Sequence, residues 1–219
     1  METNLHKQVN IPVGKVTLQG ELFIPHNAKA IIIFSHGSGS SRFSKRSQMV
    51  ANYMHTKSIG TLLFDLLTEQ EDVHYYNRFD IDLLTKRLAG ATEWLQKFPA
   101  AKDCRIGFFG ASTGAASALK AASVLPNISA VVSRGGRPDL AMDDLHKVKA
   151  PTLLIVGSLD GNVLQMNREA LAKLQCEKKL EVVQGASHLF EEHGTMDKVC
   201  ELAGEWFKKY FQVTGTIKK

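Results

Sequence analysis

A serine between two glycines follows an apolar segment in the middle of the chain. Residues 106–109 are apolar, and residues 110–114 read Gly-Ala-Ser-Thr-Gly, the pattern G-x-S-x-G with Ser112 at its centre. A strand, such a turn and a helix of small residues together expose a serine hydroxyl above a sheet, where it can attack a carbonyl carbon. The alternative is a glycine-rich turn that contains an incidental serine.

A nucleophilic serine needs a histidine base, and the histidine needs a carboxylate that orients it. Asp160 follows the apolar run 152–156, and His188 lies in a loop after the predicted strand 180–183. The order serine, aspartate, histidine is the one that a G-x-S-x-G turn of this kind requires. We therefore predict Ser112, Asp160 and His188 as catalytic residues.

Other residues compete for these roles. Asp139, Asp143 and Asp144 lie in or near a predicted helix, and Asp197 opens the C-terminal helix. Asp160 could instead cap a helix that begins near Gly161, which is a common use of aspartate. His193 is the alternative base, although Glu-Glu-His-Gly is more typical of a surface turn, and His188 could be an ordinary loop histidine.

The anion that forms during attack on an ester needs two backbone N–H donors. We expect one from Thr113, directly after the serine, and the other from Ser38, in the loop Ser-His-Gly-Ser-Gly after the apolar run 30–34. His36 and Gly37 of the same loop are candidate substrate contacts. A phosphate-binding loop is the alternative, but this segment has neither G-x-x-x-x-G-K nor G-x-G-x-x-G.

Three arginines follow predicted strands close to these loops. Arg42 comes after the first loop, and Arg134 and Arg137 come after the apolar segment 130–132. Guanidinium groups bind carboxylate or phosphate in a bidentate manner, so we predict that these arginines contact an acidic part of the substrate. Pairing with Asp65 or Asp139 on the surface is an equally good explanation.

Alternating strand and helix patterns must position these residues. Residues 16–24 alternate apolar and polar, which predicts an antiparallel edge strand with one wet face. Five continuous apolar runs predict strands that are covered on both faces: 30–34, 61–64, 106–109, 130–132 and 152–156. Apolar spacings of three and four predict helices over 81–98 and 199–210. The fold class is therefore α/β, with a mostly parallel central sheet and helices on both faces.

The segment 67–79 lacks helical or strand periodicity and is long for a loop. We expect it to lie beside the site and to supply aromatic walls from Tyr75, Tyr76 or Phe79. An exposed connection without a function is the alternative.

Composition excludes several classes of protein. The 219 residues are 44% hydrophobic and 22% charged, which is typical of one globular domain over 1–219 without a separate lid domain. The net charge of +5 is scattered among the acids, so nucleic-acid binding is not expected. Cys104, Cys176 and Cys200 are too widely spaced for a zinc site, and neither a signal segment nor a membrane span is evident. We expect a cytoplasmic protein, monomer or homodimer, without metal or cofactor.

Four segments together carry a family resemblance: HGSGSS, GASTG, VGSLDGNV and GASHLF. They resemble the α/β-hydrolase superfamily, and the short chain is most similar to the dienelactone hydrolase family. The resemblance implies the α/β-hydrolase fold, Ser112 as nucleophile, His188 as base and acid, and Asp160 as its orienter. It also implies the amides of Ser38 and Thr113 as oxyanion donors.

Two positions depart from the family pattern. Dienelactone hydrolases proper have a cysteine where this chain has Ser112, and a glutamate in the loop that here reads His36-Gly37-Ser38. An ordinary serine carboxylesterase that cleaves small esters or lactones is therefore the function we expect. An acyltransferase or perhydrolase with the same triad, and a non-catalytic binding module on the same fold, are the alternatives.

Overall fold

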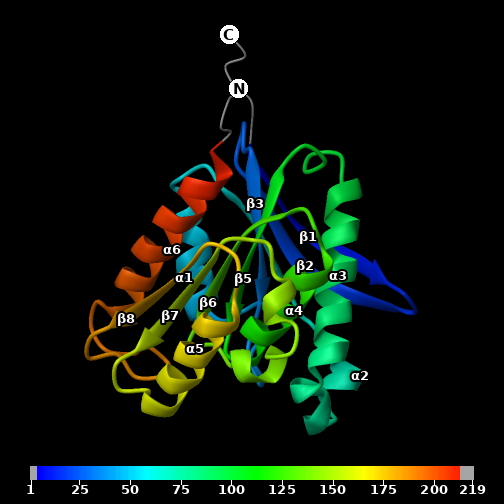
Figure 1. Cartoon of the computed structure of the whole chain (residues 1–219). Helices are drawn as coiled ribbons and strands as arrows, with labels where there is room; N and C mark the ends of the chain where they lie inside the picture. Colours follow the sequence, from blue (N-terminus) through cyan, green and yellow to red (C-terminus); the bar gives the residue numbers. More distant parts are fainter. Residues whose placement is uncertain (1–3, 213–219) are drawn as a thin grey trace.

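One mixed sheet forms the centre of the computed structural model, which describes residues 4–212 (Figure 1). The strands are β1 (Leu5–Val13), β2 (Val16–Ile24), β3 (Ala30–Ser35), β4 (Gly60–Phe64), β5 (Arg105–Ala111), β6 (Ile128–Arg134), β7 (Thr152–Gly157) and β8 (Lys178–Val183). Their order across the sheet is β1-β2-β4-β3-β5-β6-β7-β8. The strands from β4 to β8 in this order are parallel, whereas β1 and β2 are antiparallel to their neighbours.

The parallel strands are apolar along their length because helices cover both faces of the sheet. The helices are α1 (Lys45–His55), α2 (Glu69–Asp72), α3 (Ile81–Lys97), α4 (Thr113–Val124), α5 (Gly161–Lys173) and α6 (Thr195–Phe211). One apolar core lies between the sheet and α3, α4 and α5, and a second lies between the sheet and α1 and α6 (Figure 1). This arrangement confirms the predicted fold class.

Residues 16–24 form an antiparallel strand, as predicted, but this strand does not lie at the edge of the sheet. The strand β2 is antiparallel, yet it pairs with β4 on one side and with β1 on the other, so β1 is the edge strand. In β1, Val9, Ile11 and Val13 are buried and alternate with exposed polar residues and Pro12. This alternation is the signal for a half-buried strand, although the polar first residues of the chain obscure it.

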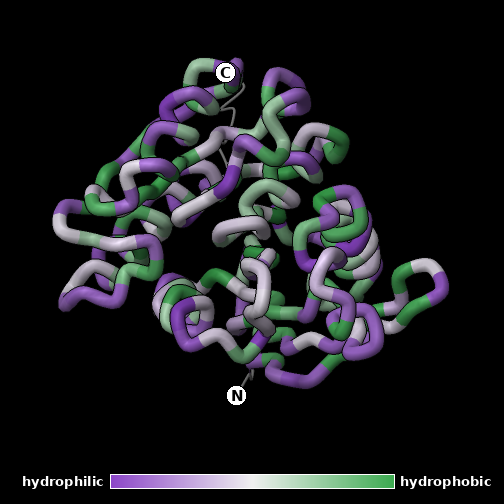
Figure 2. The backbone as a smooth tube through the Cα atoms, turned by 90° about the horizontal axis from the view of Figure 1, so that it is seen from below, coloured by the Kyte–Doolittle hydropathy of each residue, from purple (hydrophilic) through white to green (hydrophobic). Residues whose placement is uncertain are grey.

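Parallel pairing brings several strand ends to one edge of the sheet. Phe34 of β3 pairs with Phe109 of β5, and Arg134 of β6 pairs with Ala111 of β5 and Ile155 of β7. The loops that follow these strands therefore meet at one edge, which lies at the bottom of Figure 1 and faces the viewer in Figure 2. Ligands of parallel α/β sheets bind at this edge.

The segment 67–79 is more ordered than its sequence suggests. It contains α2, with a capping box between Thr68 and Glu71, and the 3-10 helix η1 (Tyr75–Phe79). Both are too short to give a periodic pattern, which is why the sequence reads as a loop. Two further 3-10 helices, η2 (Pro138–Ala141) and η3 (Leu145–Lys147), replace the helix expected around Asp139 and Asp144.

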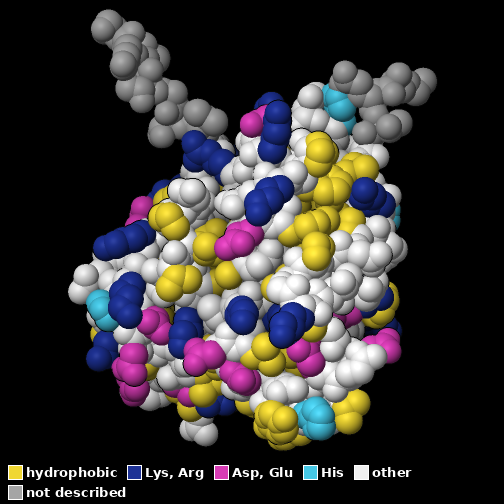
Figure 3. Space-filling view, turned by 90° about the vertical axis from the view of Figure 1, so that its right-hand side faces the viewer, with side chains coloured by type: hydrophobic (Ala, Val, Ile, Leu, Met, Phe, Trp, Pro, Cys, Tyr) yellow, Lys and Arg dark blue, Asp and Glu magenta, His cyan; other side chains and the backbone are white. Residues whose placement is uncertain are grey.

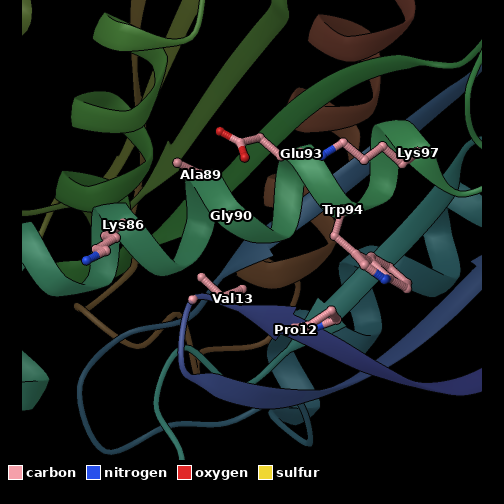
Figure 4. Close-up of a pocket in the computed structure, with 9 residues that line it drawn as sticks. Pro12, Val13, Lys86, Ala89, Gly90, Glu93, Trp94 and Lys97 are labelled. Carbon is pink, nitrogen blue, oxygen red and sulfur yellow. The ribbon is translucent and has the colours of Figure 1, made fainter.

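A cavity of about 440 Å³ lies between the β1–β2 turn and α3 (Figure 4). Its walls include Val13 and Trp94, and Gly90 lets the two elements approach: a methyl group on Gly90 would lie 2.4 Å from a Val13 methyl carbon. The cavity holds no residue of the predicted triad. We therefore regard it as a consequence of hairpin-to-helix packing.

Candidate active site

Ser112 occupies a strained turn between β5 and α4. Its φ is 51° and its ψ is −122°, a backbone conformation that serine rarely adopts. The turn needs glycine on both sides, because a methyl group on Gly110 would lie 2.5 Å from the Ala115 Cα atom. On Gly114 it would lie 2.1 Å from the Ser35 carbonyl oxygen. Such strain at a partly exposed serine is typical of a nucleophile held in place by the surrounding packing.

Asp160 and His188 come together from two other strand ends. The Nδ1 atom of His188 lies 2.6 Å from the Oδ2 atom of Asp160, and the side chains are 36% and 14% exposed. Asp160 occupies the N-cap position of α5, but its side chain accepts no hydrogen bond from that helix. The carboxylate therefore orients the histidine and does not cap the helix, which leaves Nε2 of His188 directed away from Asp160.

The competing residues have other partners or positions. Asp139 pairs with Arg137, and Asp144 pairs with Lys147 and Lys120. His193 is exposed in the turn before α6. The ion pairs of the two aspartates and the exposed position of the histidine therefore require no catalytic role for these three side chains.

Ser112 and His188 lie on either side of the end of β6. The Ser112 N–H donates to the Arg134 carbonyl oxygen at 3.2 Å, and a methyl group on Gly135 would lie 3.6 Å from Nδ1 and Cε1 of His188. Within residues 4–212 the Ser112 hydroxyl itself makes no hydrogen bond. Hydrogen bonds between nucleophile and base are often long in proteins without substrate and shorten when substrate binds.

The loop after β3 lies directly against Ser112. A methyl group on Gly37 would lie 3.1 Å from the Ser112 Cβ atom, so only glycine fits there without displacement. The Ser38 N–H points toward the same region but donates to the Thr113 hydroxyl oxygen at 2.9 Å. A substrate oxyanion that uses the Ser38 amide must therefore replace or share this bond with Thr113.

His36 supports this loop from behind. The Leu66 N–H donates to Nε2 of His36 at 3.1 Å, so the ring proton resides on Nδ1, which donates to the Gly37 carbonyl oxygen at 3.0 Å. Burial lowers the pKa of His36 below its ordinary value, which favours this neutral form. We expected His36 to contact the substrate, but both of its ring nitrogens are engaged with backbone.

The three predicted arginines differ in their partners. Arg42 binds Asp65 through its guanidinium group and its backbone N–H, and Arg137 forms a bidentate pair with Asp139 at 2.9 and 2.8 Å. The surface-pairing alternative therefore explains Arg42 and Arg137. Arg134 is only 6% exposed and forms no ion pair with any described residue.

Neither a metal-binding cluster of side chains nor a membrane-spanning helix occurs among the described residues. No group of three or more histidine, cysteine, aspartate or glutamate side chains between residues 4 and 212 could hold a metal ion. No helix in that range is long and apolar enough to cross a membrane. On the face that Figure 3 shows, basic and acidic side chains are interspersed.

Comparisons with known proteins place the chain in a family and identify similar structures. The model of the dienelactone hydrolase family matches residues 18–212. The chain belongs to the dienelactone hydrolase family. A dienelactone hydrolase from Anabaena variabilis has a very similar structure, with a TM-score of 0.93 and 49% identity over 96% of this chain and 100% of that one. The esterase Est1E from Butyrivibrio proteoclasticus shares the fold, with a TM-score of 0.80 and 16% identity over 93% of this chain and 98% of Est1E.

Two Mycobacterium tuberculosis relatives of this dienelactone hydrolase family member carry a different name. Both are provisionally named phosphoribosyl transferases and are 49% identical over 202 residues, which is 92% of this chain but 46% of their own length. The chain thus spans about half the length of these relatives. Family membership and structural similarity together show that the matched region has the α/β-hydrolase fold.

Proposed function

We propose that this protein is a serine hydrolase that cleaves carboxylic esters or lactones of small substrates through an acyl-enzyme. The observation that carries the proposal is the hydrogen bond of 2.6 Å between His188 and Asp160, next to a serine in a strained G-x-S-x-G turn. A histidine oriented by a carboxylate is the base that a serine nucleophile needs.

The reaction follows from these roles. Ser112 attacks the ester carbonyl carbon while Nε2 of His188 accepts the hydroxyl proton, and Asp160 stabilises the resulting imidazolium. The Thr113 and Ser38 amides stabilise the oxyanion, and for Ser38 this requires displacement of the Thr113 hydroxyl. His188 then protonates the leaving alcohol. Water, deprotonated by His188, cleaves the acyl-enzyme to release the acid and restore Ser112.

Phosphoribosyl transfer, the activity in the name of the mycobacterial relatives, is not our proposal for this chain. Those relatives are more than twice as long as the matched region. A phosphate-binding G-x-x-x-x-G-K loop is absent from the loop after β3, where Gly37 instead lies against Ser112. We propose that phosphoribosyl transfer belongs to the part of the relatives that this chain does not match.

The test is hydrolysis of p-nitrophenyl esters of increasing acyl length by wild type and by Ser112→Ala. We expect wild type to hydrolyse acetate and butyrate esters, and Ser112→Ala to lose at least about 10³-fold in kcat. In an apolar tunnel each added CH₂ would raise kcat/KM roughly fourfold, because burial of a CH₂ contributes about 0.8 kcal/mol. We expect a flatter series, because the pocket lined by the loop of Gly37, which lies against Ser112, has a volume of only about 10 Å³. Equal rates for wild type and Ser112→Ala would contradict the proposal.

A fluorophosphonate probe gives an independent measurement. Wild type should be labelled at Ser112, and Ser112→Ala should not be labelled. The partly exposed loop serine Ser40 provides the control variant, Ser40→Ala, which should be labelled like wild type.

A further inference from the structure

Between residues 4 and 212, one buried cation next to the triad, Arg134, has no anionic partner. The Nη1 atom of Arg134 lies 3.4 Å from the His188 carbonyl oxygen, and its guanidinium carbon lies 5.6 Å from the centre of the Phe190 ring. Its Nε atom is buried without a hydrogen-bond partner. A buried charge without a counter-ion is costly, and natural proteins retain such groups mainly where they have a task.

A second arginine approaches the same loop from α1. The Nη1 atom of Arg46 lies 3.4 Å from the Glu191 carboxylate, whose side chain is 67% exposed, and the Nε atom of Arg46 is also buried without a partner. Burial and the charge of Arg46 lower the pKa of Arg134 to about 10, so Arg134 is still charged at neutral pH. The guanidinium groups of Arg134 and Arg46 thus repel each other, and the solvated carboxylate of Glu191 lies beside Arg46.

The N-terminus of α1 adds to the positive charge. The first turn of α1 contains Lys45 and Arg46 and no acidic residue. The helix dipole is positive at this end, so cations are unfavourable here and an anion is favourable. The loop residue Phe190, whose ring Arg134 faces and which directly precedes Glu191, has a φ of 57°, a strained value for an aromatic residue.

We propose that Arg134 and Arg46 form a subsite for an oxyanion group of the substrate, a carboxylate or a phosphate. The inference rests on the proposed function, because it places the charged group of the substrate beside the ester that Ser112 attacks. The position agrees with this, since the Arg134 carbonyl oxygen accepts the Ser112 N–H. In the free protein the Glu191 carboxylate pairs with Arg46. When substrate binds, its anionic group replaces the Glu191 carboxylate next to Arg46.

The kinetic experiment compares p-nitrophenyl acetate with mono-p-nitrophenyl succinate, which carries a carboxylate. The readout is the ratio of kcat/KM for the charged ester to that for the neutral ester. Arg134→Gln and Arg46→Gln should each lower this ratio at least about tenfold, because a bidentate contact with the carboxylate is lost. Arg137→Gln is the matched control, because Asp139 already neutralises Arg137 at the same edge of the sheet, and it should leave the ratio unchanged.

A binding experiment separates the subsite from catalysis. Ser112→Ala is titrated calorimetrically with inorganic phosphate and, separately, with succinate. We expect saturable binding of at least one of the two anions, weaker binding when Arg134→Gln is added, and tighter binding when Glu191→Gln is added. The two anions distinguish a phosphate site from a carboxylate site.

Three results would overturn the subsite: no binding of either anion, an equal loss in the Arg137→Gln control, or an unchanged ester ratio in Arg134→Gln. Equal losses for both esters in Arg134→Gln would instead make Arg134 a residue that only positions the loop of His188. If anions bind but neutral and charged esters are not hydrolysed by wild type, the proposed function fails while the subsite remains.

Discussion

At the residue scale, the site depends on which hydrogen bond each side chain makes. Asp160 and His36 both stand beside backbone amides, yet Asp160 turns to the His188 ring while His36 turns to the backbone of Gly37 and Leu66. In the proposed reaction the first arrangement prepares a base for Ser112. The second holds the loop that carries the Ser38 amide, so the two residues act on different sides of the same reaction.

Replacement of Asp160 tests the first arrangement. Asp160→Asn should lower kcat/KM for p-nitrophenyl acetate by about 10³ to 10⁴, because the amide neither fixes the tautomer of His188 nor stabilises its imidazolium. Asp139→Asn is the control and should stay within about threefold of wild type, since Asp139 pairs only with Arg137. Circular dichroism checks that both variants are folded. A similar loss in both variants would remove Asp160 from the triad.

At the scale of elements, close packing of β3, β5 and α4 positions Ser112, the proposed nucleophile. Ala115 and Ala116 are fully buried, and the glycines of the turn leave no free space around them. The strain at Ser112 persists because three elements fix the turn from different sides. Local sequence alone would allow less strained turns, so the tertiary contacts are the cause of this conformation.

Gly114→Ala tests this packing. The added methyl group would lie 2.1 Å from the Ser35 carbonyl oxygen, a backbone atom that cannot move aside alone. We expect the free energy of unfolding in urea to fall by about 3 kcal/mol, the upper part of the range for overpacked cores. In Gly161→Ala, by contrast, the methyl group meets no atom within 4 Å and should leave stability unchanged or raise it by about 0.5 to 1 kcal/mol. Equal stabilities of the two variants would contradict this account.

At the scale of the whole molecule, the stability of the fold depends on pH through a histidine that lies between a helix and the sheet. This residue is His55, at the end of α1. Its Nε2 atom lies 2.8 Å from the Thr61 hydroxyl in β4, and its ring stacks on Phe23 of β2 at 3.9 Å. Burial, followed by the nearby His6, lowers the pKa of His55 to about 4.

Stability should therefore fall in mild acid. The unfolded chain binds a proton at His55 near pH 6.5 and the folded chain only near pH 4, so the contribution to stability is present above pH 6.5 and is lost as pH falls through this window. After allowance for the partial exposure of the ring, we expect this loss to be about 1 kcal/mol between pH 7 and pH 5. Urea unfolding at the two pH values measures it.

His55→Gln keeps a hydrogen-bonding group near Thr61 but does not titrate. Between pH 7 and pH 5 the variant should therefore lose about 1 kcal/mol less free energy of unfolding than wild type loses. His193→Gln, at an exposed loop position, should behave like wild type. If His55→Gln and wild type lose equal stability, another group is responsible for the acid sensitivity.

The sequence by itself determined much of this protein. Continuous apolar runs are typical of strands covered on both faces, and parallel strands bring their following loops to one edge, so Ser112, Asp160 and His188 could be predicted to meet. The same reasoning named the loop of Gly37 and Ser38. Periodicity and turn chemistry are local properties, and for this reason they can be read directly from the order of the residues.

Only the tertiary structure decided how charged and polar groups are paired. Asp65 and Asp139 neutralise Arg42 and Arg137, while Arg134 is left without an acid, and all three arginines look alike in the sequence. The bond from the Ser38 amide to the Thr113 hydroxyl and the position of β1 at the sheet edge are likewise long-range. The physical reason is that such contacts depend on distances between segments far apart along the chain, which local patterns do not encode.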